Sequence, residues 1–256
     1  MAHFDTDPTC GEVPHSRTSS QEKCRRVLIV NADDFGRSEN VNAGVIVAHE
    51  EGIVTSASLM VRWPAASRAA AYARKRPQLS VGLHVDLAEW VYREGGWSSL
   101  YTVAPLEDPG ALEVEVARQL AAFRELLGRD PSHLDSHQHL HLSEPLRSVL
   151  IGVARDLDVP LRGLDPRVRY RGDFYGQSGK GEPCPGAIGV EALLALLAGL
   201  GPGVTELGCH PGLAGECDSV YGTERAIETR TLTDARVRIA LEWHGITQWS
   251  YHHLSR

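Results

Sequence analysis

Histidines and an aspartate are concentrated in one ten-residue stretch, HLDSHQHLHL over residues 133–142. Leucines alternate there with polar residues, which apart from Ser136 are Asp135, His137, His139 and His141. In an extended strand alternate side chains share one face, so the pattern predicts a strand with a carboxylate and three imidazoles on one side. Carboxylate and neutral imidazole together bind divalent metal ions, which makes a metal site the first hypothesis. The alternative is a surface strand with a polar face.

Polar residues also follow other short apolar runs. They are Asp33 and Asp34 after residues 27–30, His84 after 79–83, and His210 after 204–209. Singly these are weak indications, because paired aspartates and His-Pro-Gly are common in turns. The carboxyl ends of parallel strands meet at one mouth of an α/β fold, so we expect these side chains to converge there with Asp135 and His137. Such a set supplies an acid–base pair and a metal site of one carboxylate and two histidines.

This inventory of side chains favours hydrolysis of an amide. A divalent ion held by few protein ligands keeps a position for water, lowers the pKa of that water and polarises a carbonyl. A neighbouring carboxylate can take the water's proton, and a histidine can protonate the departing amine. The sequence has no Gly-x-Ser-x-Gly elbow and no cysteine in a nucleophile motif, so a covalent acyl-enzyme is not indicated. Two alternatives stay open: a different metal-dependent amide or ester hydrolase, and a non-catalytic protein that binds metal or sugar.

The elements that must position these residues alternate along the chain. Strands are expected over residues 27–30, 53–60, 79–83, 133–142, 159–162, 204–209 and 246–251. Helices are expected over 38–52, 64–76, 111–127, 145–157, 190–200 and 233–244, with irregular loops over 90–110 and 163–185. The alternation predicts a single-domain α/β fold with a parallel sheet or barrel.

Composition narrows the class of protein. The chain has 256 residues, 42% of them hydrophobic, which suffices for one large core. Its net charge of −7 argues against a nucleic-acid partner, and no apolar run is long enough for a membrane span. Five cysteines without a CxxC pair suggest a reducing, cytoplasmic setting. Residues 1–25 are polar and without hydrophobic period, so we expect a disordered leader before a domain over 26–256.

Five blocks in this chain resemble those of the YdjC/ChbG-type carbohydrate deacetylases. They are VLIVNADDFG (27–36), GIVTSASLM (52–60), VGLH (81–84), HLDSHQHLH (133–141) and ELGCHPG (206–212). The resemblance extends over about residues 26–251, in the motif order of the family. It implies a distorted (β/α) TIM-like barrel and metal-dependent removal of an acetyl group from an N-acetylated sugar, with chitooligosaccharides as the best-known substrates.

The resemblance also implies roles for individual residues. Asp34, His84 and His137 would hold one divalent metal ion, either zinc or magnesium. Asp33 would be the general base. His210 would be the general acid or would orient the acetyl group of the substrate.

Further residues are candidates for supporting roles. Arg162 lies where the family often has arginine and would steer Asp33 electrostatically, although a surface arginine is the alternative. Asp135 would support a metal-binding histidine, and His139 would support the site or the substrate. Aromatic residues in the two loops could stack on sugar rings or serve as lids or dimer contacts: Trp90, Tyr92, Trp97, Tyr101, Phe174 and Tyr175. A homodimer is therefore permitted by these aromatics but not required.

Overall fold

The first long strand, β1 (Arg26–Phe35), is the centre of the fold in the computed structural model, which describes residues 25–214 and 221–254. Its run of β-branched and apolar residues is buried on both faces, as expected of a strand inside a parallel sheet. After β1 the chain turns sharply at Gly36, whose φ is +95° and where a Cβ atom would come within 2.8 Å of the Met60 carbonyl oxygen. Ser38 then caps α2 (Glu39–Glu50) by accepting a hydrogen bond from the Val41 amide.

A parallel sheet of seven strands is built around β1. The order is β6-β3-β2-β1-β8-β7, and β9 pairs with the beginning of β1. The other strands are β2 (Ser56–Leu59), β3 (Ser80–Val85), β6 (Leu134–Ser136), β7 (Val168–Arg171), β8 (Gly203–Cys209) and β9 (Ile246–Gln248). Because every pair is parallel, the carboxyl ends of the strands lie at one rim of the curled sheet.

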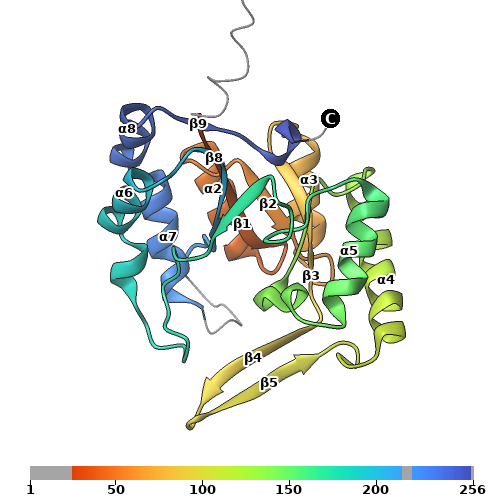
Figure 1. The fold of residues 1–256 in the computed structure, drawn as a ribbon. Coiled ribbons are helices and arrows are strands. Elements are labelled where there is room, and N and C mark those ends of the chain that lie inside the picture. Colours follow the sequence, from red (N-terminus) through yellow and green to blue (C-terminus); the bar gives the residue numbers. More distant parts are fainter. Residues whose placement is uncertain (1–24, 215–220, 255–256) are drawn as a thin grey trace, which may run out of the picture.

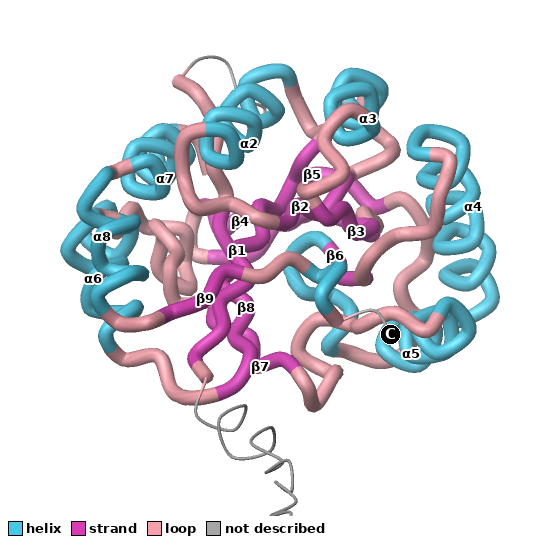
Figure 2. The backbone as a smooth tube through the Cα atoms, turned by 90° about the horizontal axis from the view of Figure 1, so that it is seen from above, coloured by secondary structure: helices cyan, strands magenta, loops and turns pink. Residues whose placement is uncertain are grey.

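Helices surround the sheet on its outside (Figure 2). Besides α2 they are α3 (Ala66–Arg74), α4 (Pro109–Leu127), α5 (Leu146–Leu157), α6 (Val190–Ala198), α7 (Thr223–Thr233) and α8 (Ala235–Trp243). Three short 3-10 turns complete the described elements: η1 (His137–Leu142), η2 (Pro185–Ile188) and η3 (Tyr251–His253). None of the helices in the described residues is both long enough and apolar enough to cross a bilayer. The arrangement is a single-domain, distorted (β/α) half-barrel, which confirms the predicted fold class.

The loop expected over 90–110 is largely a β-hairpin, so that prediction is wrong. β4 (Ala88–Arg93) and β5 (Gly96–Thr102) pair antiparallel and extend from the end of β3, beyond the body of the molecule (Figure 1). The turn residues Glu94 and Gly95 both have positive φ, 52° and 83°, as a two-residue hairpin turn of the primed type requires. The Glu-Gly pair between two aromatic-containing runs was the available sequence signal for this turn.

The single-faced histidine strand over 133–142 is also wrong. The strand ends at Ser136, and His137 begins a 3-10 turn in which Gln138 and His139 have φ of 49° and 55°. Ser136 stabilises the break, because its hydroxyl accepts the main-chain N–H of His141 and contacts the His141 Nδ1 at 2.8 Å. The imidazoles consequently point in different directions rather than to one side.

The other differences between the predicted and the observed elements lie mainly in the second half of the chain. The expected strand over 159–162 is reduced to one bridge between Leu134 and Leu161. β7 lies within the segment 163–185 that was expected to be irregular, and α7 occupies a segment for which no element was expected. The predicted leader falls almost entirely on residues 1–24, which lie outside the described residues.

Candidate active site

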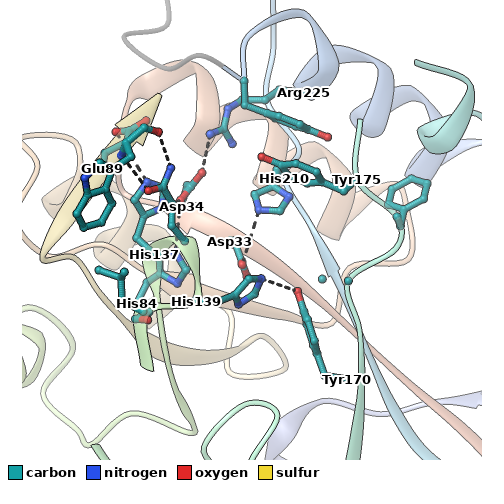
Figure 3. A pocket seen from close by; sticks show the side chains of 18 of the residues that line it. Asp33, Asp34, His84, Glu89, His137, His139, Tyr170, Tyr175, His210 and Arg225 are labelled. Carbon is teal, nitrogen blue, oxygen red and sulfur yellow. Dashed lines mark hydrogen bonds and ion pairs between the residues drawn. The ribbon is translucent and has the colours of Figure 1, made fainter. Parts of the chain in front are cut away.

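A cavity of about 680 Å³ opens at the carboxyl ends of the strands (Figure 3). Four of the polar residues that the sequence singled out lie at its base: Asp33, Asp34, His84 and His137. β1, β3 and the start of η1 supply them, and the adjacency of the strands brings the side chains together. His139 and His210 also line this cavity, whereas Asp135 and Arg162 lie behind its wall.

Two imidazole nitrogens converge on one oxygen of Asp34. The Asp34 Oδ1 lies 3.4 Å from the His84 Nε2 and 3.2 Å from the His137 Nδ1. This Oδ1 is buried and accepts no hydrogen bond from the described residues, so it is available to bind a cation. One carboxylate and two imidazoles within ligand distance of one another fit a divalent ion, and zinc or another transition ion suits this donor set best.

Neighbouring residues keep the Asp34 carboxyl ionised. Burial opposes its ionisation, but Arg225 and His137 outweigh that effect and hold the pKa of the carboxyl well below its usual value. The Arg225 Nη2 donates to the Asp34 Oδ2 at 2.5 Å, which leaves the Oδ1 directed at the two histidines. Asp34 is therefore an anionic oxygen donor at any ordinary pH.

Asp135 holds His84 from behind. The Asp135 Oδ1 lies 2.8 Å from the His84 Nδ1, and its Oδ2 accepts from Ser58 at 2.7 Å and from Arg162 at 2.8 Å. A carboxylate on Nδ1 fixes the orientation of the ring and presents the Nε2 toward Asp34. This is the geometry expected for a carboxylate that supports a metal-binding histidine.

Asp33 forms a two-pronged ion pair with Arg162. The Arg162 Nη1 and Nη2 lie 2.6 and 2.7 Å from the Asp33 Oδ2 and Oδ1, and Asn31 donates to the Oδ1 at 2.9 Å. Burial opposes ionisation of Asp33, but Arg162 outweighs it and lowers the pKa. The carboxylate of Asp33 at the cavity base is thus ionised and held in one orientation by Arg162.

Arg162 is buried, at 2% exposure, so the alternative of a surface arginine is wrong. Its Nε donates to Glu206 at 2.8 Å, and Tyr251 donates to the same carboxylate at 2.6 Å. The guanidinium contacts three buried carboxylates, those of Asp33, Asp135 and Glu206. Each of its nitrogens has a partner, so it cannot move independently of Asp33.

His210 lies between two carboxylates. Its Nε2 is 3.8 Å from the Asp33 Oδ2, and its Nδ1 is 4.0 Å from the Glu228 Oε1. Its main-chain N–H donates to the Glu228 Oε2 at 2.5 Å, which fixes the backbone at this point. Burial lowers the pKa of His210 to about 4, so the imidazole is neutral near pH 7.

His139 and His141 separate at the break after Ser136. The His139 Nε2 is 3.3 Å from the Tyr170 hydroxyl, while its Nδ1 is buried without a hydrogen-bond partner among the described residues. Burial lowers the pKa of His139 to about 4, so it faces the cavity as a neutral imidazole. His141 points away, and its Nε2 lies 3.1 Å from the Arg162 carbonyl oxygen.

Three titratable residues of the site were missed by sequence reasoning. Arg225 and Glu228 come from α7, and Glu89 comes from β4. Both elements lie in segments that were expected to be irregular or were unassigned, so nothing placed their side chains near the cavity. The spacing of Arg225 and Glu228 on one face of a helix was the only available signal.

The loop aromatics divide into two groups. Trp90, Trp97, Phe174 and Tyr175 line the cavity, and the structure adds Tyr170 and Tyr221 to them. Tyr101 instead donates to the Asp86 Oδ1 at 2.7 Å, which anchors the base of the hairpin. Tyr92 packs edge-on against Trp97 at a centroid distance of 5.6 Å.

Comparison with known proteins identifies the family. A family model described as YdjC-like protein matches residues 27–242. The chain belongs to the YdjC-like family. Among YdjC-like relatives, a chitooligosaccharide deacetylase of Klebsiella pneumoniae (strain 342) is 31% identical, covering 88% of this chain and 98% of the relative. A carbohydrate deacetylase of Vibrio vulnificus (strain YJ016) is also 31% identical, covering 89% of this chain and 96% of the relative.

Solved structures share the fold of this YdjC-like chain. A crystal structure from Enterococcus faecalis V583 superposes with a TM-score of 0.71 at 26% identity, covering 91% of this chain and 100% of that one. A family 4 acetyl xylan esterase from Clostridium thermocellum, solved with a cobalt ion, gives a TM-score of 0.51 at 13% identity, with 90% of each chain covered. The second likeness is one of fold alone. The resemblance stated from the sequence blocks is confirmed.

Proposed function

We propose that this chain is a carbohydrate N-deacetylase that depends on a divalent metal ion and removes the acetyl group of an N-acetylated sugar by hydrolysis. One observation carries the proposal. The Asp34–His84–His137 cluster lies beside the ionised Asp33 at the base of a cavity with aromatic walls. Relatives that match nearly their full length are named chitooligosaccharide or carbohydrate deacetylases, which supports the same substrate class.

Asp34, His84 and His137 would hold the ion, through the oxygen and the two nitrogens that already converge. A bound divalent ion would lower the pKa of a water molecule and polarise the acetyl carbonyl. Zinc is the ion that two imidazoles and a carboxylate favour, and magnesium is the alternative.

Asp33 is proposed to take the proton of the attacking water. Arg162 keeps the carboxylate ionised and oriented, because both of its oxygens are held at 2.6 and 2.7 Å. His210 stands 3.8 Å away, and its lowered pKa favours a neutral imidazole that orients the acetyl group. The proton can then pass from Asp33 to the departing amine, directly or through His210.

The sugar is proposed to lie against the aromatic walls. Trp90 and Trp97 from the hairpin, and Tyr175 from the segment after β7, offer flat apolar faces for sugar rings. His139 adds a neutral imidazole that can exchange hydrogen bonds with hydroxyl groups. The cytoplasm is the proposed setting, since Cys184 and Cys209 are both free thiols.

The proposal is tested by acetate release. Purified protein is loaded with zinc or magnesium and incubated with diacetylchitobiose and a panel of other N-acetyl sugars and simple esters, and the products are identified by mass spectrometry. We expect acetate and the free amino sugar, and we expect a chelator to abolish both. No acetate from any N-acetyl sugar with either metal would contradict the proposal, and turnover of esters alone would point to the other class of hydrolase.

A further inference from the structure

Glu89, which lines the cavity, faces the nitrogen of His137 that points away from Asp34. The His137 Nδ1 faces Asp34, whereas its Nε2 is directed at the Glu89 Oε2, 3.8 Å away. A histidine that binds a metal through one nitrogen commonly presents its other N–H to a carboxylate, which fixes the ring and raises its basicity. The Nε2 is buried and has no hydrogen-bond partner among the described residues, and the Glu89 Oε2 is a carboxylate oxygen within ion-pair distance of it.

Glu89 itself is held rigidly. Its Oε2 accepts from the Arg37 Nη2 at 2.6 Å, and both side chains are only 2% exposed. The Arg37 guanidinium in turn stacks over the Trp63 ring, 5.0 Å from its centroid. A buried carboxylate that is fixed by an arginine can orient a neighbouring ring, because its oxygen atoms are shielded from solvent.

The hairpin that carries Glu89 also contacts the His137 segment through its backbone. Gln138, the residue after His137, accepts from the Trp90 main-chain N–H at 2.9 Å and donates to the Trp90 carbonyl at 2.9 Å. Trp90 and Trp97 of the same hairpin line the cavity. One hairpin therefore touches the metal-facing histidine, its strained neighbour and the space proposed for the sugar.

We infer that Glu89 is a positioning residue for His137, and that the β4–β5 hairpin sets the geometry of this metal-facing histidine while its tryptophans contact the sugar. The inference rests on the proposed function and deepens it. The hairpin would then position a proposed metal ligand in addition to contacting the substrate.

Zinc affinity separates this role from a merely structural one. We would measure zinc binding to the metal-free protein by calorimetry, together with kcat and KM on diacetylchitobiose, for wild type and Glu89→Gln. Loss of the carboxylate behind His137 should weaken zinc binding about 10- to 100-fold and lower kcat at subsaturating zinc, with little change in KM. Thermal unfolding of the metal-free forms reports whether the variant is folded.

Glu115→Gln is the matched control. Glu115 is also a buried acid paired with arginine, at 2.7 Å from the Arg118 Nη2, but it lies on α4 and does not face His137. The Glu115→Gln protein should bind zinc with the affinity of wild type. Trp97→Ala removes a tryptophan that is 60% exposed, and it should raise KM several-fold without changing zinc affinity.

The outcomes are distinct. Wild-type zinc affinity in Glu89→Gln, with an active wild type, overturns the inference and leaves the proposed function standing. A wild type that neither binds zinc nor releases acetate overturns the proposed function itself. If Glu89→Gln does not fold, Gln138→Ala is the substitute, because Gln138 is exposed; it should weaken zinc binding a few-fold, and unchanged binding would overturn the inference.

Discussion

The carboxylate of Asp33 and the guanidinium of Arg162 form a two-pronged ion pair at 2.6 and 2.7 Å across 129 residues of sequence. Both partners are buried, and the same guanidinium also contacts Asp135 and Glu206. Since Asp135 holds His84, one arginine links the proposed base to the carboxylate that orients a proposed metal ligand. The proposed base and the proposed metal site are therefore both positioned by the buried Arg162 side chain.

Asp33→Asn should keep the metal and lose turnover. The amide has the size of the carboxylate but cannot take a proton, so kcat should fall about 10²- to 10⁴-fold while zinc affinity stays near wild type. Steady-state kinetics and calorimetry measure the two quantities. Glu206→Gln is the control, because Glu206 also pairs with Arg162 but does not line the cavity. A fully active Asp33→Asn protein would show that the base is assigned wrongly.

Arg162→Met should destabilise the fold. Removing the guanidinium leaves Asp33, Asp135 and Glu206 buried without their shared cation, and breaking a buried ion pair costs about 3–5 kcal/mol. Urea denaturation of the metal-free protein measures the free energy of unfolding. A loss below about 1 kcal/mol, the range of exposed ion pairs, would contradict the buried network.

Glu228 should make stability depend on pH. Burial raises the pKa of its carboxyl from 4.5 to about 8, so between these values the folded chain binds more protons than the unfolded chain. The free energy of unfolding should therefore fall as pH rises through this window, with a contribution of up to about 1.4 kcal/mol per pH unit. Glu228→Gln removes that contribution. Denaturation of both proteins from about pH 5 to 8 should show that the free energy of unfolding of wild type falls relative to that of the variant as the pH rises. The same pH dependence in both proteins would contradict the expectation.

Zinc should stabilise the folded chain. An ion that binds only the folded state at 100 times its Kd raises the free energy of unfolding by about 2.7 kcal/mol, and a chelator should reverse the gain. Thermal unfolding with and without zinc measures the effect. His137→Ala removes one of the three converging donors and should abolish most of the shift. An equal shift in wild type and variant would place the zinc elsewhere.

Much of the polar cluster could be predicted from local patterns. Asp33, Asp34, His84 and His210 each follow an apolar run of strand length, and parallel topology alone brings the ends of such strands to one rim. That argument needs only the alternation of strands and helices, which is a local property of the sequence. The general location of the cavity follows from the same argument.

The details of the cluster depend on longer-range contacts. The strand through His133 ends at Ser136 because the serine hydroxyl binds the His141 main chain. Gln138, which has a positive φ, is held by two hydrogen bonds to the main chain of Trp90 in the hairpin. Arg225 reaches Asp34 across 191 residues. The sequence near Arg225 does not show that its partner is Asp34.

The amino-acid sequence by itself determined the α/β class, the family and the set of residues that line the base of the cavity, because these follow from strand-length apolar runs and the side chains at their ends. Only the tertiary structure decided which oxygen faces which nitrogen, and that Glu89, Arg225 and Glu228 belong to the site. The physical reason is burial: a charged side chain in an unassigned segment is expected to face water until the fold buries it and pairs it with a distant partner.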